Sequence, residues 1–200
     1  MLLSVSKALQ GFLQATVAPP DETPIERWVQ IAGNDQSSGD GRGELHLSLY
    51  EVEPDPFLRN VRGKPEGGTY GPTPLPLTLH YMVTYPVGLA EHRHEALGGV
   101  LRAFHTQPSL NALDYLAVDE SKQVARDGTI ASALQVLLEL PAVEKLGHMW
   151  SAQGNGAQLA LFYRVNVALI PAFLQVRTVA VDGFDPPIPH PMPSGGGGAR

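Results

Sequence analysis

The densest group of potentially metal-binding side chains is the run Glu91-His92-Arg93-His94-Glu95. Imidazoles and carboxylates are both ligands that divalent transition metals accept. On a helix, however, His92 and His94 lie about 200° apart around the axis and cannot share one ion. Apolar residues at helical spacing follow, from Leu97 to Phe104. We therefore expect a solvated first helical turn whose glutamates complement the helix dipole, and we assign no metal ligand.

The other polar residues give weaker signals of chemistry. His80 is out of phase with the leucines of its strand, so it faces the opposite side, and His105 lies at the end of a predicted helix. The chain has no G-x-S-x-G elbow, and residues 39–43 lack the spacing of a phosphate-binding loop. Trp28 and Trp150 are typical of core or interface anchors. We predict no catalytic residue, no cofactor and no enzymatic activity.

Composition excludes several classes of protein. The 200 residues contain no cysteine, which excludes a disulfide scaffold, a cysteine-based zinc site and a thiol nucleophile. The net charge of −6 argues against a protein that binds phosphate backbones, and no apolar stretch reaches the ~18 residues of a membrane span. We therefore expect neither a nucleic-acid partner nor a membrane partner.

The elements around these residues follow from hydrophobic periodicity. Helical spacing predicts helices over about Leu3–Ala15, over Leu89–His105 and from Pro141 through Trp150. The first is an amphipathic helix rather than a signal peptide, because no basic segment precedes it. Residues 109–127 are ambiguous. Alternation predicts strands over about Ile25–Ile31, Glu44–Val52, Leu75–Tyr85, Ala133–Leu140, Gln158–Ile170 and Leu174–Val181.

These elements predict an α+β fold with a mixed, mainly antiparallel sheet flanked by helices. The 21 glycines and 18 prolines are concentrated in loops at about 33–43 and 57–74 and in the tail. The tail combines a proline-dense segment with four consecutive glycines, a composition typical of an extended arm. We expect a single domain over residues 1–182 and a C-terminal arm over residues 183–200.

Several segments together resemble one known family. They are residues 47–60 (LSLYEVEPDPFLRN), 74–85 (PLPLTLHYMVTY), 97–108 (LGGVLRAFHTQP), 146–152 (LGHMWSA) and 161–165 (LFYRV). In order and at these intervals, over about residues 3–175, they resemble the tail-terminator or cap proteins of phage-tail-like extracellular contractile injection systems, of the antifeeding-prophage and virulence-cassette type.

The resemblance implies a structural role on a phage tail-terminator-like fold. Such a protein caps the distal end of the inner tube and sheath as a ring, expected to be a hexamer, and ends polymerisation. The implied partners are copies of itself and the sheath and tube proteins, with assembly in the cytoplasm before the particle is used. From position and composition we expect interface contacts from Arg59, Asn60, Arg62, Pro186, Pro187 and Pro189.

Three alternatives remain at this point. An adaptor or baseplate subunit of the same particle would share the structural character. A small metal-dependent hydrolase would use residues 91–95, and a regulatory domain would bind a small ligand. Neither of the last two would assemble with sheath and tube.

Overall fold

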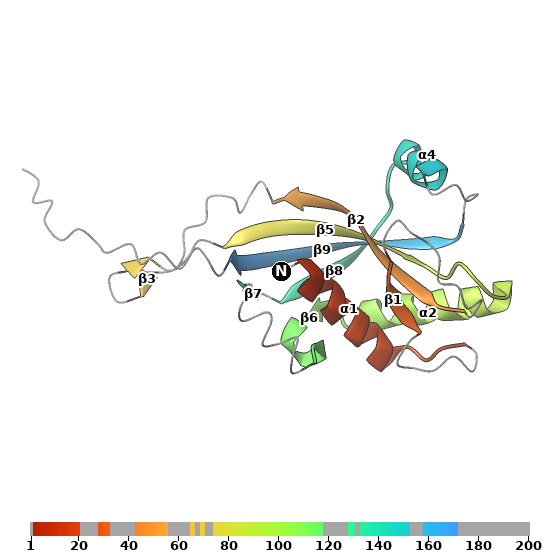
Figure 1. Cartoon of the computed structure of the whole chain (residues 1–200), viewed down its shortest axis with the longest axis horizontal. Coiled ribbons are helices and arrows are strands. Elements are labelled where there is room, and N and C mark those ends of the chain that lie inside the picture. The colour runs from red at the N-terminus through yellow and green to blue at the C-terminus, as the bar shows by residue number, and fades with distance from the viewer. Residues whose placement is uncertain are drawn as a thin grey trace, which may run out of the picture.

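A computed structural model of the chain describes residues 2–20, 28–32, 43–55, 65–66, 69–70, 74–117, 128–130, 133–152 and 158–171. Helices and strands alternate irregularly along these residues, and one sheet runs through the middle of the molecule (Figure 1). In chain order the elements are α1 (Leu2–Thr16), β1 (Val29–Ile31), β2 (Leu45–Pro54), β3 (Pro65–Glu66), β4 (Thr69–Tyr70), β5 (Leu75–Thr84), α2 (Ala90–Thr106), β6 (Ser109–Leu110), the 3-10 helix η2 (Ala112–Tyr115), β7 (Gly128–Ile130), β8 (Leu134–Glu139), α4 (Val143–Ala152) and β9 (Ala160–Pro171).

The main sheet has seven strands among the described residues. Their order is β1-β2-β5-β9-β8-β6, and β7 also pairs with β9. Only β1 and β2 run parallel; the other pairs in this sheet are antiparallel. Strands β3 and β4 form a separate antiparallel pair. The prediction of a mixed, mainly antiparallel sheet is confirmed.

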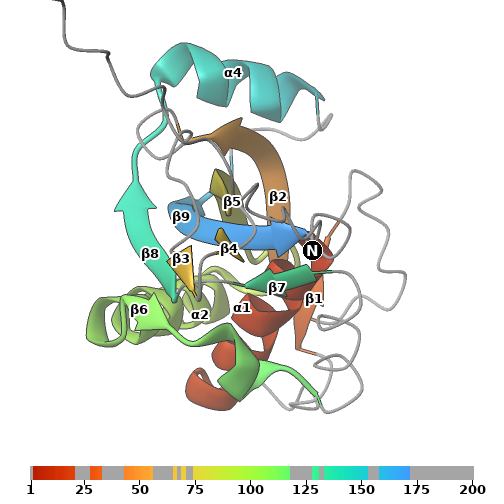
Figure 2. The ribbon, with the colours of Figure 1, turned by 90° about the vertical axis from the view of Figure 1, so that its left-hand side faces the viewer.

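One face of the sheet carries the hydrophobic core. Alternate residues of β5, such as Leu79 and Tyr81, are buried there at 0% and 1% exposure. Helices α1 and α2 lie together on this side, whereas α4 lies on the other (Figure 2). Phe12 of α1 joins the elements, with its ring 5.3 Å from that of Phe104 and 5.2 Å from that of Tyr115. The helices therefore bury their apolar stripes against the apolar side of the alternating strands.

Helix α1 approaches the backbone of η2 so closely that a side chain would not fit. A Cβ atom built on Gly11 would overlap the carbonyl oxygen of Tyr115. Glycine at this position therefore permits the contact between the two elements.

The periodic segments form where the sequence predicts them, and short elements depart from the prediction. The strand predicted to end at about Val52 extends to Pro54, the last residue of β2. The ambiguous stretch contains β6 and η2, and the segment after it begins β7 at Gly128. These pieces have two to four residues, so no period is long enough to reveal them. The predicted strand at Leu174–Val181 lies outside the described residues. None of the helices in the described part is both long and apolar enough to cross a membrane.

Candidate functional site

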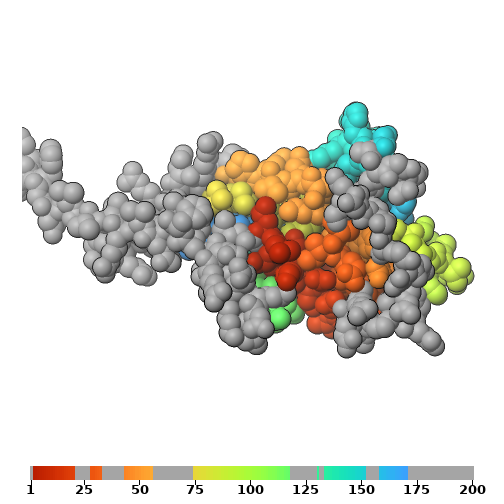
Figure 3. All heavy atoms as spheres, in the orientation of Figure 1, coloured from red at the N-terminus to blue at the C-terminus, as the bar shows by residue number. Residues whose placement is uncertain are grey.

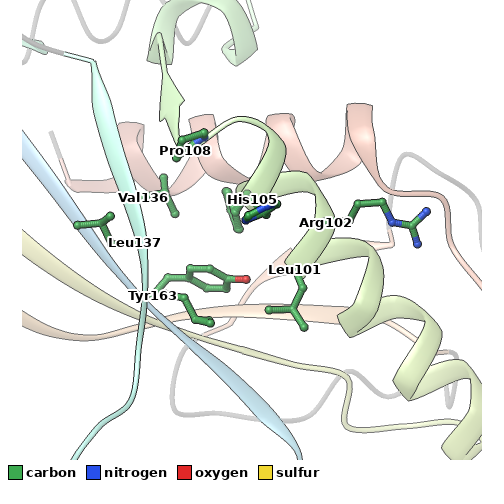
Figure 4. Close-up of a pocket in the computed structure, with 9 residues that line it drawn as sticks. Leu101, Arg102, His105, Pro108, Val136, Leu137 and Tyr163 are labelled. Carbon is green, nitrogen blue, oxygen red and sulfur yellow. The ribbon is translucent and has the colours of Figure 1, made fainter.

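An apolar groove of about 660 Å³ lies between helix α2 and strand β8. Leu101 and Tyr163 point toward each other across this groove, and the guanidinium of Arg102 points away from it (Figure 4). Val136 and Leu137 both line the groove, and their side chains point to opposite sides of β8, as the pleat of a strand requires (Figure 4). The groove is thus an extension of the core face that no described element covers.

The phenol of Tyr163 is the only described side chain of the groove with an unpaired buried polar atom. The residue is 3% exposed, and its hydroxyl has no hydrogen-bond partner among the described residues. Burial raises the pKa of Tyr163 above its ordinary value, so the phenol is neutral at physiological pH. A neutral phenol in an apolar wall is not a general base. The lining is mainly apolar, which suits the groove to binding an apolar surface.

Beside this groove, one edge of strand β8 is open among the strands that the structure describes. Strand β6 pairs only with Leu134 and Gln135, and the backbone N–H of Val136 then donates to the carbonyl of Pro108 at 2.8 Å. No described strand pairs with β8 beyond that point on this side. Leu138 is 62% exposed there, and Leu140 just after the strand is 89% exposed. An open edge with exposed leucines favours pairing with another chain.

A second apolar hollow, of about 460 Å³, adjoins the same end of β8. Leu138 lines both the groove and this hollow. The hollow is also lined by Leu146 and Trp150 of α4 and by Leu159, which precedes β9. Trp150 therefore lies at a surface hollow, and Trp28 is fully buried in the core. The groove, the strand edge and the hollow form one continuous apolar surface, which we call the β8 surface.

The opposite face of the sheet carries a different kind of site, created by a β-bulge. Leu49 pairs with Tyr81 and Glu51 pairs with His80, so Tyr50 is an extra residue in β2. The bulge reverses the alternation of the strand. Glu51 and Glu53 consequently share a face with His80 instead of with the core leucines.

These side chains form a cluster around His80, which is 5% exposed. Its Nδ1 lies 2.7 Å from the Oε2 atom of Glu139, in β8. Its Nε2 lies 3.6 Å from the Oε2 atom of Glu53 and has no hydrogen-bond partner among the described residues. Glu51, Glu53 and His80 each offer an atom within 4.8 Å of the other two. We call Glu51, Glu53, His80 and Glu139 the His80 cluster.

Helix α4 supplies a cation to this cluster. Lys145 forms an ion pair with Glu51, and its Nζ lies 5.4 Å from the centre of the Tyr50 ring. The view in Figure 3 shows α4 (cyan) beside β2 (orange). Burial, followed by the charges of Glu139, Glu51 and Glu53, raises the pKa of Tyr50 to about 12. Burial is the larger cause of this shift, and the three carboxylates add to it.

The structure places the sequence-derived candidates as follows. Residues 91–95 lie at the start of α2, as expected, but of the two glutamates only Glu91 is in the first turn and Glu95 lies in the second. Arg93 donates from Nε to the carbonyl of Tyr85 at 3.0 Å. His105 lies in the last turn of α2, and His80 faces away from the core, both as predicted. The proposed interface residues Arg59, Asn60, Arg62, Pro186, Pro187 and Pro189 lie outside the described residues.

Sequence reasoning missed both the His80 cluster and the β8 surface. The only signal for the first was the spacing of Glu51 and Glu53, which puts two carboxylates on one face of a strand. Strict alternation from Leu49 would place both glutamates on the core side of the sheet. No residue pattern in this segment predicts the bulge that moves them to the other side. The sequence signal for the β8 surface was the run of apolar residues at 136–138 together with Leu140. Periodicity alone does not distinguish such an exposed apolar edge from a strand buried in the core.

The chain is similar to proteins of known structure and to one described family. Residues 4–179 match the family described as the Pvc16 N-terminal domain. A search of curated proteins finds no match to the chain. One solved structure is the PVC sheath/tube terminator of an extracellular contractile injection system in its extended state, at 18% identity and a TM-score of 0.61. Another is the tube-terminating cap of the anti-feeding prophage, at 20% identity and a TM-score of 0.62.

These two similarities cover 92% and 94% of this chain but only 61% and 62% of the solved chains. The present chain therefore spans about six tenths of the length of those terminators. At this identity the likeness establishes the fold, which is the tail-terminator-like fold expected from the sequence. Because the family match extends over residues 4–179 of the 200, the chain belongs to the Pvc16 N-terminal domain family.

Proposed function

We propose that the chain is a structural terminator subunit of a contractile injection system, capping the distal end of the inner tube and sheath. The observation that carries this proposal is the family match over residues 4–179, on a fold shared with two solved terminators. Its partners are the sheath and tube proteins, and it assembles in the cytoplasm before it becomes part of the particle. The role requires no catalysis.

The terminator works as a ring, with six copies as the expected number. Subunits of a cyclic ring meet through two different surfaces, so each copy needs one surface that fits a dissimilar surface on its neighbour. The β8 surface is suited to be one of them, because it combines an open strand edge with exposed Leu138 and Leu140. A neighbouring copy that covered it would remove apolar area from water and satisfy the free backbone groups of the edge.

Further contacts come from loops and from the tail. We assign them to Arg59, Asn60 and Arg62, and to the prolines of the arm over residues 183–200, which extends from the domain of residues 1–182. A proline-dense segment loses little entropy when it docks, because its backbone is already restricted. Pro186, Pro187 and Pro189 belong to this segment.

Particle length tests the proposal. Deleting the gene should give particles with longer or unstable sheaths by electron microscopy, because nothing then stops polymerisation, and the intact gene should restore normal length. A Leu138→Arg variant should fold and fail to restore it, because a charge blocks the apolar edge. Leu89→Arg, on a residue that is 65% exposed at the start of α2, is the matched control. Particles of normal length in the deletion strain would refute the capping role. Restoration of normal length by the Leu138→Arg variant would show that the β8 surface is not needed for it.

A further inference from the structure

We propose that Glu51, Glu53 and His80 form a binding site for a divalent transition-metal ion of the zinc class. Glu139 acts behind them as the partner that orients the imidazole. Its three ligands lie on the polar face of the sheet and do not line the β8 surface, whereas Glu139 also lines the hollow that belongs to that surface.

The orientation of His80 is the first step. Its Nδ1–H donates to the Oε2 atom of Glu139 at 2.7 Å, which leaves the lone pair on Nε2. That nitrogen is buried, has no hydrogen-bond partner among the described residues, and points toward the carboxylates of β2. A buried polar atom without a partner costs free energy, and a metal ion would satisfy it. A histidine held by a carboxylate on its other nitrogen is the common arrangement of metal-binding histidines.

The carboxylates are the second step. Glu51 and Glu53 lie two residues apart after the bulge, so both point to the side of His80. Their oxygens and the histidine nitrogen lie within 4.8 Å of one another. Ligands bound to one zinc ion at about 2.0–2.2 Å lie roughly 3.5 Å apart, so the site needs only a small contraction. Glu53 is able to supply it, because its side chain is 56% exposed.

The donor set selects the kind of ion. One imidazole and two carboxylates suit zinc and similar transition metals, whereas calcium takes six to eight oxygen ligands. Three protein ligands leave a fourth tetrahedral position for water. The charge on the ion would also balance the carboxylates of Glu51, Glu53 and Glu139.

Lys145 competes with the ion in this site. Its ammonium forms an ion pair with the Oε2 atom of Glu51, so its positive charge opposes a metal ion on that carboxylate. Among the described residues, Glu139 on β8 and Arg164, which pairs in register with His80 on β9, also carry charge near the site. Removing the lysine charge should therefore raise the affinity for the metal. A variant that merely disturbed the structure would lower this affinity, so the increase distinguishes the two explanations.

The experiment is a titration of the full-length chain, without an affinity tag and after treatment with a chelator, with Zn²⁺ by calorimetry. We expect one ion per chain, a tetrahedral visible spectrum with Co²⁺ as a probe, and no displacement by excess Mg²⁺ or Ca²⁺. Glu53→Gln should lower the affinity at least tenfold, and Glu139→Gln by about 10- to 100-fold. Lys145→Met should raise it severalfold.

Two controls keep the test sharp. Glu95→Gln, on an exposed residue of α2, should leave the affinity unchanged, as should replacing His92 and His94 with alanine. Zn²⁺ should raise the melting temperature of the unaltered chain and have a smaller effect on the Glu53→Gln variant. The proposal is overturned if the unaltered chain binds no Zn²⁺, or if Glu53→Gln binds it with the same affinity. Glu53 is exposed, so that variant tests the ligand without disturbing the core.

Discussion

The two faces of the central sheet are built from the same strands but hold together in different ways. The face under α1 and α2 is apolar, with Leu47, Leu79 and Val165 each at most 1% exposed. The opposite face carries buried polar groups, among them His46 at 4% and His80 at 5% exposure. The apolar face is stabilised by hydrophobic burial, which does not depend on the orientation of the groups. The polar face depends on hydrogen bonds and ion pairs between specific partners.

In the described part of the chain, the apolar face provides most of the stability and the polar face provides groups that can bind an ion. Truncating a large buried side chain on the core face costs about 2–5 kcal/mol, whereas a partly exposed ion pair is worth about 0–1 kcal/mol. The polar face therefore contributes less to folding, yet it holds a buried nitrogen and carboxylates arranged around it. Changes to the two faces should consequently differ in size and in their dependence on pH.

The largest effect should follow from Phe12→Ala on the core face. Phe12 is 1% exposed and its ring contacts those of Phe104 and Tyr115, so its removal leaves a cavity between three elements. We expect a loss of about 3–5 kcal/mol in the free energy of unfolding, measured by urea denaturation. Leu89→Ala, at a residue that is 65% exposed, should change it little. Equal losses in both variants would show that the core face is not what stabilises the fold.

An intermediate effect should come from protonation of His46 on the polar face. Burial lowers the pKa of His46 below its ordinary 6.5, and the nearby Glu44 only partly opposes this. The unfolded chain then binds the proton more tightly, so stability is complete above pH 6.5 and falls as the pH drops toward the folded-state pKa. Melting temperatures across this range should show the decline.

A His46→Gln variant provides the comparison for that titration. Glutamine keeps a polar side chain but does not titrate, so the decline just below pH 6.5 should become shallower. If the melting temperature of this variant falls with pH as steeply as that of the unaltered chain, other groups cause the decline, and His46 does not make the polar face pH-dependent.

The smallest effect should follow from Lys145→Met, which breaks the link between α4 and the polar face. Lys145 and Glu51 are 39% and 30% exposed, so water screens their attraction. We expect a loss of about 0.2–1 kcal/mol in the free energy of unfolding, reduced further by salt. Glu144→Gln, on the same helix, is the matched control. A loss as large as that of Phe12→Ala would contradict the proposed difference between the faces.

Periodicity predicted the long elements because each repeats its pattern over several turns or several residue pairs. The stretch around Leu97 and Val100 predicted α2, and the alternating row from Leu159 to Leu169 predicted β9. Short pieces such as β6 and β7 were not predictable, because two or three residues adopt a strand only when β8 or β9 offers hydrogen bonds. The loop and tail residues proposed as interface contacts stay predictions.

The sequence by itself determined the apolar face, the absence of cysteine chemistry, the solvated helix start at residues 91–95 and the resemblance to a terminator family. These properties depend on residue type and on spacing within one segment. The tertiary structure alone decided that Glu51, His80 and Glu139 meet, since they come from three strands and one bulge sets their register. It also decided that no described strand pairs with this edge of β8 beyond Gln135, because strand order fixes which edges find partners, and strand order depends on contacts far apart in the chain.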